Sequence, residues 1–124
     1  MIQEVKDFIE YNIDLIEERR WEDLFKNWCC YNKDYYFEDM MDILKVVEPD
    51  IWNLTHDVRS NILYKIGISL LTRLSQTSKV VTFDYVGSEI CSLMGFEGDE
   101  LINIINKAAK HIGLSMSTNG WYRV

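Results

Sequence analysis

The stretch that decides the fold is KVVTFDYVGSEICSLMGFEGDELINIINKAAKHIGLSMSTNGWYRV, residues 79–124. Most of the glycines of the chain lie in it, at positions 87, 95, 98, 113 and 120. Because glycine ends helices and forms tight turns, this stretch predicts several short elements. Val80 and Val81 predict a short strand, and Thr82 predicts the cap of a helix that ends near Gly95.

A second helix and a hairpin complete this stretch. Asp99 is expected to cap the helix, and Gly113 is expected to end it. Asn119-Gly120 between alternating residues predicts a β-hairpin, because this dipeptide favours two-residue hairpin turns. The residues expected on the buried side of the helix are Leu101, Ile105 and Ile112.

Helices are also predicted before residue 79. Thr55 is expected to cap a long helix, and Gly67 inside it predicts a close packing contact, because Gly costs about 1 kcal/mol relative to Ala in a helix. Residues 2–18 place apolar residues, Ile13 among them, at steps of three and four, which predicts one amphipathic helix.

The order of long helix, short strand, helix, turn, helix and hairpin resembles a winged helix-turn-helix. The residues that carry this resemblance are Thr82, Glu89-Ile90, Leu93-Met94-Gly95, Leu101, Ile105, Ile112-Gly113-Leu114 and Asn119-Gly120-Trp121-Tyr122. The fold expected is mainly α, with an N-terminal helical bundle packed on a winged-helix-like unit that ends in a β-hairpin. The expected parts are an acidic helical subdomain at 1–54 and a winged-helix-like subdomain at 55–124, forming one compact unit overall.

The resemblance implies that residues 99–112 form a recognition helix and that the hairpin is the wing. Asn pairs with adenine and Lys contacts phosphate, so the implied nucleic-acid-binding set suits DNA. Its members are Asn103, Asn106, Lys107, Lys110, His111 and Arg123. Carboxylates at Glu97, Asp99 and Glu100 oppose this role, because they would meet phosphates at the start of the helix.

The first helices resemble the opening helices of small prophage and mobile-element proteins. The similar segments are FIEYNIDLIE at residues 8–17 and WEDLF at residues 21–25. This resemblance implies an origin in a bacteriophage or an integrated element and brings no chemistry with it.

The formal net charge of −7 disfavours nonspecific binding to nucleic acid. Fifteen of the twenty Asp and Glu residues lie within residues 1–78. Trp21, Leu24, Phe25 and Trp28 predict a short helix from residue 21 to about residue 31. An aromatic cluster begins in this helix and consists of Trp28, Tyr31, Tyr35, Tyr36 and Phe37. It has two interpretations, a surface that docks on a protein or a core junction between helices. The candidate protein-binding residues in it are Trp28, Tyr31, Tyr35 and Tyr36.

The sequence offers no catalytic apparatus. His56 and His111 are far apart in the chain and stand in no metal-ligand spacing, so no metal and no cofactor are expected. The odd set Cys29, Cys30 and Cys91 fits a reducing cytoplasm better than a disulfide framework. No apolar run approaches the roughly 20 residues that cross a bilayer, so we expect no membrane contact.

These features predict a non-catalytic protein of phage or mobile-element origin that docks on a host protein, for example as an inhibitor of a defence or nucleic-acid enzyme of the anti-CRISPR kind. The alternative is a winged-helix DNA-binding transcriptional regulator. A homodimer is left open.

Overall fold

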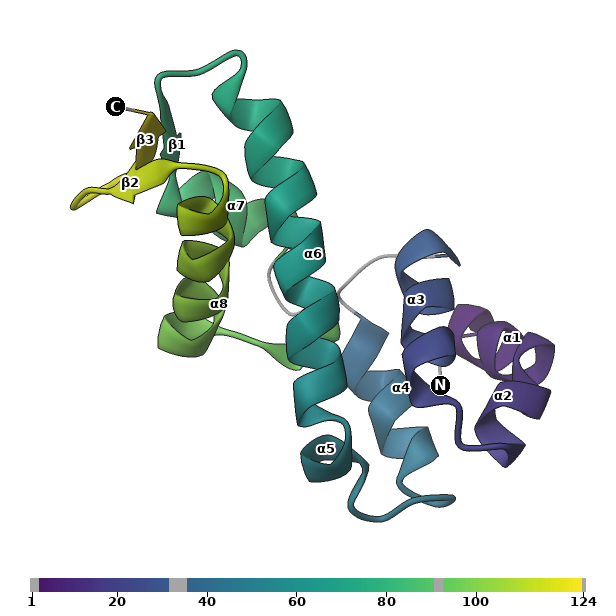
Figure 1. The fold of residues 1–124 in the computed structure, drawn as a ribbon. Helices are drawn as coiled ribbons and strands as arrows, with labels where there is room; N and C mark the ends of the chain where they lie inside the picture. Colours follow the sequence, from purple (N-terminus) through teal and green to yellow (C-terminus); the bar gives the residue numbers. More distant parts are fainter. Residues whose placement is uncertain (1–2, 32–35, 91–92, 124) are drawn as a thin grey trace. The chain divides into compact units, whose positions relative to one another are not determined.

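The computed structural model describes residues 3–31, 36–90 and 93–123. Within these ranges the protein is mainly helical, as the sequence predicts, and it has a three-stranded antiparallel sheet (Figure 1). In chain order the elements are α1 (Gln3–Tyr11), α2 (Ile13–Glu17), α3 (Trp21–Tyr31), α4 (Phe37–Leu44), α5 (Ile51–Leu54), α6 (His56–Ser75), β1 (Val80–Thr82), α7 (Phe83–Ile90), the 3-10 turn η2 (Leu93–Gly95), α8 (Gly98–His111), β2 (Leu114–Met116) and β3 (Gly120–Arg123).

The described residues form two compact units. Unit 1 contains the residues up to Ser60 together with η2, and unit 2 contains residues 61–90 and the residues from Phe96 onward. The boundary falls inside α6, after Ser60, whereas the sequence predicts it after residue 54. η2 therefore belongs to unit 1, although α7 and α8 belong to unit 2.

The core of unit 1 is aromatic. Phe8 of α1 meets Trp28 of α3 edge-on, with ring centroids 5.0 Å apart. Phe37 of α4 packs edge-on against both Trp28 and Phe25, at 6.3 Å and 5.6 Å. All four rings are buried, and such pairs each contribute about 0.5 to 1.5 kcal/mol beyond the burial of their area. These contacts hold α1, α3 and α4 together.

The single helix predicted for residues 2–18 is wrong, because the helix breaks at Asn12. The Asn12 side chain is 5% exposed and donates from Nδ2 to the Phe8 carbonyl oxygen at 2.8 Å. Its Oδ1 accepts a hydrogen bond from Asn27 Nδ2 on α3, also at 2.8 Å. Asn side chains that bond to nearby backbone compete with the helical ladder, which accounts for a break at this residue.

A buried arginine connects α5, α6 and η2 within unit 1. Arg59 is 3% exposed, and its Nη1 and Nη2 donate to the carbonyl oxygens of Met94 and Trp52 at 2.7 Å and 2.6 Å. The guanidinium also lies 4.8 Å from the Trp52 ring centroid. Thr55 does not act as the predicted N-cap, because its hydroxyl donates to Ile51 and accepts from Arg59 Nε.

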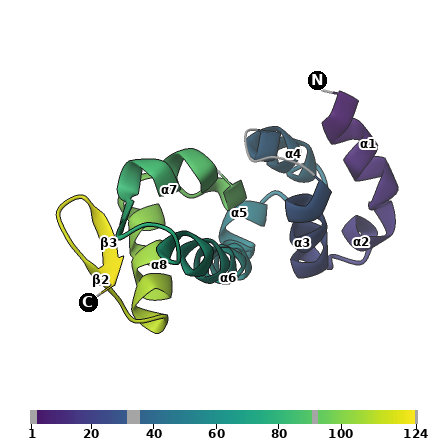
Figure 2. The ribbon, with the colours of Figure 1, turned by 90° about the horizontal axis from the view of Figure 1, so that it is seen from above.

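Unit 2 arranges its sheet in the order β1-β3-β2, at one end of α7 and α8 (Figure 2). Val81 pairs with Trp121 across β1 and β3, and both side chains are buried. The Trp121 ring meets Phe83 edge-on at 4.8 Å. On the opposite face of the sheet, the cross-strand pair Val80 and Tyr122 is exposed.

The hairpin between β2 and β3 is present, but Asn119-Gly120 does not form its turn. Neither residue has a positive φ, which a two-residue Asn-Gly turn requires. The loop is closed instead by Ser117, whose Oγ accepts from the amides of Asn119 and Gly120 at 3.3 Å and 3.2 Å. Gly120 is the first residue of β3 and pairs with Thr82 of β1. A Cβ at Gly120 would lie 2.7 Å from Thr82 Cα and would also meet the Val81 carbonyl oxygen.

α8 begins at Gly98, two residues earlier than a cap at Asp99 predicts. Its cap position is the extended residue Glu97, so Asp99 lies in the first turn and is not the cap. Gly113, with φ +84°, follows the helix as predicted. Leu101 and Ile105 are buried, which confirms their assignment, whereas Ile112 is only half-buried because it lies past the last helical residue.

The close contact predicted at Gly67 is confirmed. A Cβ at this position of α6 would lie 2.9 Å from Ile105 Cδ1 and 3.2 Å from Ala108 Cβ, both on α8. The glycine therefore allows the two helices of unit 2 to approach closely.

We expect Gly67→Ala to lower the free energy of unfolding by about 1 kcal/mol, because overpacking of a core outweighs the gain in helix propensity. Gly87 of α7 has open space around it, so Gly87→Ala should raise the free energy of unfolding by about 0.5 to 1 kcal/mol. Urea denaturation of both variants measures the difference. Stabilisation of equal size in the two variants would contradict the packing at Gly67.

Candidate binding surfaces

The exposed side of α8 carries most of the predicted nucleic-acid-binding residues. Asn103, Lys107, Lys110 and His111 are exposed, and the His111 ring lies edge-on to Tyr64 of α6 at 6.2 Å. Asn106 does not belong to this exposed set. It is half-buried, and its Oδ1 accepts a hydrogen bond from Trp121 Nε1 at 3.1 Å. Of the predicted set, α8 therefore presents Asn103, Lys107, Lys110 and His111 to solvent.

Carboxylates surround the start of the same helix. Asp99 and Glu100 are exposed in its first turn, and Glu97 is exposed at the cap position. Acidic side chains stabilise a helix N-terminus, because the helix dipole is positive there. A phosphate approaching this end of α8 would meet three negative charges. The placement suits the stability of the helix and opposes the reading of DNA by its first turn.

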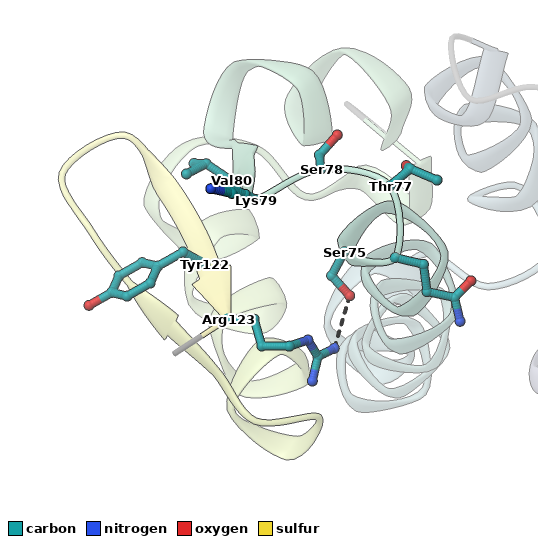
Figure 3. A pocket seen from close by; sticks show the side chains of 8 residues that line it. Ser75, Thr77, Ser78, Lys79, Val80, Tyr122 and Arg123 are labelled. Carbon is teal, nitrogen blue, oxygen red and sulfur yellow. Dashed lines mark hydrogen bonds between the residues drawn. The ribbon is translucent and has the colours of Figure 1, made fainter.

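A hollow of about 650 Å³ lies at the ends of α6, β1 and β3 in unit 2 (Figure 3). Lys79 and Arg123 line it together with several hydroxyl groups. Arg123 Nη2 donates to Ser75 Oγ at 3.1 Å, and Ser75 is the last residue of α6 (Figure 3). Because the carboxyl end of a helix is a partial negative charge, Arg123 complements α6 at this point. The same dipole weakens any attraction of the hollow for an anion.

The candidate protein-binding aromatics do not form one surface among the described residues. Trp28 is fully buried between Phe8 and Phe37, so it serves the core of unit 1, in line with the core-junction interpretation. Tyr36 is half-buried at the start of α4. Tyr35 and the side chain of Tyr31 lie outside the residues that the structure describes.

A different part of unit 1 is exposed and apolar. Tyr11, the last residue of α1, is 90% exposed, and Ile13, the first residue of α2, is 44% exposed. The sequence placed Ile13 on the buried stripe, but the break at Asn12 changes the direction in which the following turn presents its side chains. The residues Tyr11, Asn12 and Ile13 do not by themselves predict an exposed corner. The corner depends on the hydrogen bond from Asn27, which lies 15 residues later in the chain.

The corner adjoins a hollow of about 410 Å³ in unit 1. Phe8 and Tyr11 of α1 line it, together with Asn12, Asn27 and Cys30. Among the described residues of unit 1, Val46 at 86%, Leu54 at 55% and Val47 at 38% are also exposed, but none of them lines this hollow.

The described residues contain no group of three or more His, Cys, Asp or Glu side chains arranged to hold a metal ion. His56 Nδ1 lies 3.3 Å from Asp57 Oδ1, and both side chains are exposed in the first turn of α6. Among the helices that the structure describes, none combines the length and the apolar character needed to cross a membrane.

The two described cysteines have different surroundings. Cys30 is exposed, whereas burial raises the pKa of the half-buried Cys29 thiol to about 11, with a further contribution from Cys30. Burial disfavours the charged thiolate, so Cys29 holds on the order of 100-fold less thiolate at neutral pH than a free thiol. Cys91 lies outside the described residues.

We expect iodoacetamide to label Cys29 slowly at about pH 7 and faster as the pH rises toward the pKa of about 11. The measurement compares two single-thiol variants by mass spectrometry. Cys30→Ser/Cys91→Ser retains only Cys29, and Cys29→Ser/Cys91→Ser retains only Cys30. Equal rates in the two variants at neutral pH would contradict the burial of Cys29.

Comparison of the chain with protein-family models, curated proteins and solved structures finds no match. What the protein does is therefore inferred from its own side chains.

Proposed function

We propose that the protein is a non-catalytic binding protein that docks unit 1 on a basic surface of a host protein. The observation that carries this proposal is the segregation of charge between the units. Unit 1 contains fifteen Asp and Glu against seven Lys and Arg, whereas unit 2 contains five against six. Unit 1 therefore carries a net charge of −8, and unit 2 carries a net charge of +1.

A strongly acidic surface favours a basic partner for two physical reasons. Opposite potentials steer two proteins together and raise the rate of association. The same potential repels the phosphates of nucleic acid, which supply most nonspecific affinity for DNA. On α1, the exposed carboxylates of Glu4, Asp7 and Glu10 recur every three residues, about 4.5 Å apart along the axis. A closely spaced row of anions suits a partner surface that itself binds a nucleic-acid backbone.

The resemblance of the first helices to prophage and mobile-element proteins gives this proposal a context. A small acidic protein of such an origin would occupy the nucleic-acid-binding surface of a host defence or nucleic-acid enzyme and inhibit it, as anti-CRISPR proteins do. Unit 2 would then be a scaffold. Its order of elements and its sheet order β1-β3-β2 support a winged-helix-like arrangement without requiring that it read DNA.

Capture from a bacterial host lysate tests the proposal with a matched pair of charge variants. In unit 1 the substitutions are Glu10→Gln, Asp14→Asn and Glu17→Gln. In unit 2 they are Asp84→Asn, Glu89→Gln and Asp99→Asn, which remove the same charge. All six side chains are exposed, so both variants should fold.

We expect the wild type to capture basic nucleic-acid-binding proteins that elute as salt is raised, because salt screens exposed charges. Capture should fall about tenfold in the unit 1 variant and stay near the wild-type level in the unit 2 variant. An equal loss in both variants would show that net charge alone governs binding, and unchanged capture by the unit 1 variant would refute docking through this unit.

The second candidate is a winged-helix DNA-binding transcriptional regulator. Exposure of Asn103, Lys107 and Lys110 on α8 favours it, since these residue types contact bases and phosphates. In that case α8 and the β2–β3 hairpin would make the contacts, and unit 1 would not.

A further inference from the structure

We propose that the corner between α1 and α2 anchors the docking surface, and that the partner inserts an apolar side chain from within a basic surface there. This inference rests on the proposed function and specifies which part of unit 1 makes the central contact.

Two side chains that flank Asn12 are exposed at this corner of unit 1. Tyr11 exposes 90% of its surface to solvent, and Ile13 exposes 44%. Tyrosine is enriched among the few residues that dominate binding at protein interfaces, because it offers a large rigid ring at a low cost in conformational entropy. The aromatic side chain and the neighbouring isoleucine together give the partner an apolar surface to cover.

The backbone of the corner is held in place before any partner arrives. Asn12, between the two exposed residues, is 5% exposed and is bonded both to the Phe8 carbonyl oxygen and to Asn27 of α3. A binding surface that is already ordered loses less conformational entropy on association. The buried amide thus fixes the positions from which Tyr11 and Ile13 project.

The hollow beside Tyr11 gives the partner a place to insert a side chain. Its volume is about 410 Å³, and Phe8, which is 1% exposed, forms part of its wall together with Tyr11. Two aromatic rings in the lining favour an apolar side chain over a charged one. Asn27, also in the lining, is exposed and supplies a polar rim.

Charge decides which class of partner fits. Asp7, Glu10 and Asp14 lie within four residues of Tyr11, and all three are exposed. A second copy of the chain would bring the same carboxylates and a net charge of −7 to the contact, so self-association is opposed. A protein surface of Lys and Arg with an apolar residue among them fits this site. The Lys and Arg side chains would pair with the carboxylates, and the apolar side chain would fill the hollow.

Two synthetic peptides of equal charge test the inference. One peptide alternates Lys with Leu and the other alternates Lys with Ser. Their binding to the full chain is measured by fluorescence anisotropy for the wild type, Tyr11→Ser and Tyr85→Ser. Tyr85 of unit 2 is the matched control, because it is also an exposed tyrosine, at 47%. Thermal melting of each variant verifies that the fold is retained.

We expect Tyr11→Ser to weaken binding of the Lys-Leu peptide about tenfold or more, with Tyr85→Ser within about twofold of wild type. The Lys-Ser peptide should bind more weakly and should not respond to Tyr11→Ser. Equal effects of the two tyrosine variants would overturn the inference. If both peptides bound equally, and only Glu10→Gln/Asp14→Asn reduced binding, the proposed function would stand and this anchor would be wrong. Failure of both peptides to bind at low salt would overturn both proposals.

Discussion

Replacing Gly120 by Ala is expected to lower the free energy of unfolding by about 3 kcal/mol or more, at the upper end of the overpacking effects seen in proteins. The added Cβ would lie 2.7 Å from Thr82 Cα and would also meet the Val81 carbonyl oxygen, and both are backbone atoms of β1. A side chain can change its rotamer to relieve a contact, but a paired strand has to move as a whole. The sheet would therefore lose its pairing between β1 and β3 at this point.

Asn119→Ala is the matched control for this prediction. If the turn needed Asn119-Gly120 in the left-handed region, both substitutions would be costly. Because Asn119 has no positive φ and its backbone makes the local bonds, Asn119→Ala should change the free energy of unfolding by less than about 0.5 kcal/mol. Urea denaturation, followed by Trp fluorescence, measures both variants. Comparable losses would show that the turn, and not the close approach of the strands, requires the glycine.

Replacing Arg59 by Leu is expected to lower the free energy of unfolding by about 3 to 5 kcal/mol. The substitution leaves the carbonyl oxygens of Trp52 and Met94 without their guanidinium donors, at a site where Arg59 is only 3% exposed. A buried acceptor without a donor loses its hydration and gains nothing in return. The substitution should destabilise η2 as well as α5, because Met94 belongs to η2 and Trp52 belongs to α5.

Two further variants, Arg59→Lys and Arg73→Leu, show whether the loss of stability comes from the guanidinium hydrogen bonds or from the loss of a positive charge on α6. Lysine keeps the charge but cannot donate in the two fixed directions of a guanidinium, so Arg59→Lys should recover only part of the lost stability. Arg73 is an exposed residue of the same helix, and Arg73→Leu should have a much smaller effect. Denaturation midpoints equal to wild type in Arg59→Leu would contradict the buried network.

Local chemistry made the elements of unit 2 predictable. Thr82 caps α7, since its Oγ1 accepts from the Tyr85 amide at 3.1 Å, and Gly113 follows α8 with the left-handed φ that favours glycine. Gly67 in the middle of α6 predicted a close contact because nothing else explains an energetically costly glycine there. These signals depend on residues within one turn of each other, or on one residue alone.

The features of unit 1 could not be predicted because they depend on residues far apart in the chain. Asn12 breaks the first helix through a bond to a residue 15 positions later, and Arg59 meets a carbonyl group 35 positions later. In the sequence, Arg59 reads as one more surface charge on a long helix. Arg59 is buried because η2 packs near it, and the sequence pattern of α6 does not predict where η2 lies.

The candidate sites show the same limit. Trp28 belongs to a cluster of aromatic residues in the sequence, yet its side chain lies in the core of unit 1, whereas the Tyr11 side chain is 90% exposed. Apolar spacing alone does not distinguish these outcomes, since both residues lie in amphipathic helices. The distribution of charge along the chain could be predicted directly, because it depends only on the order of the residues.

Anisotropy of a fluorescent DNA duplex, titrated with the full chain at about 150 mM salt, tests most directly whether unit 1 or α8 makes the functional contacts. Docking through unit 1 predicts weak binding, with a dissociation constant no tighter than about 1 μM and no preference for sequence, and Lys107→Glu/Lys110→Glu should leave capture of the host protein intact. Sequence-specific binding at about 100 nM or tighter, abolished by Asn103→Ala/Lys107→Ala, would contradict the proposed function and establish α8 as a DNA-reading helix.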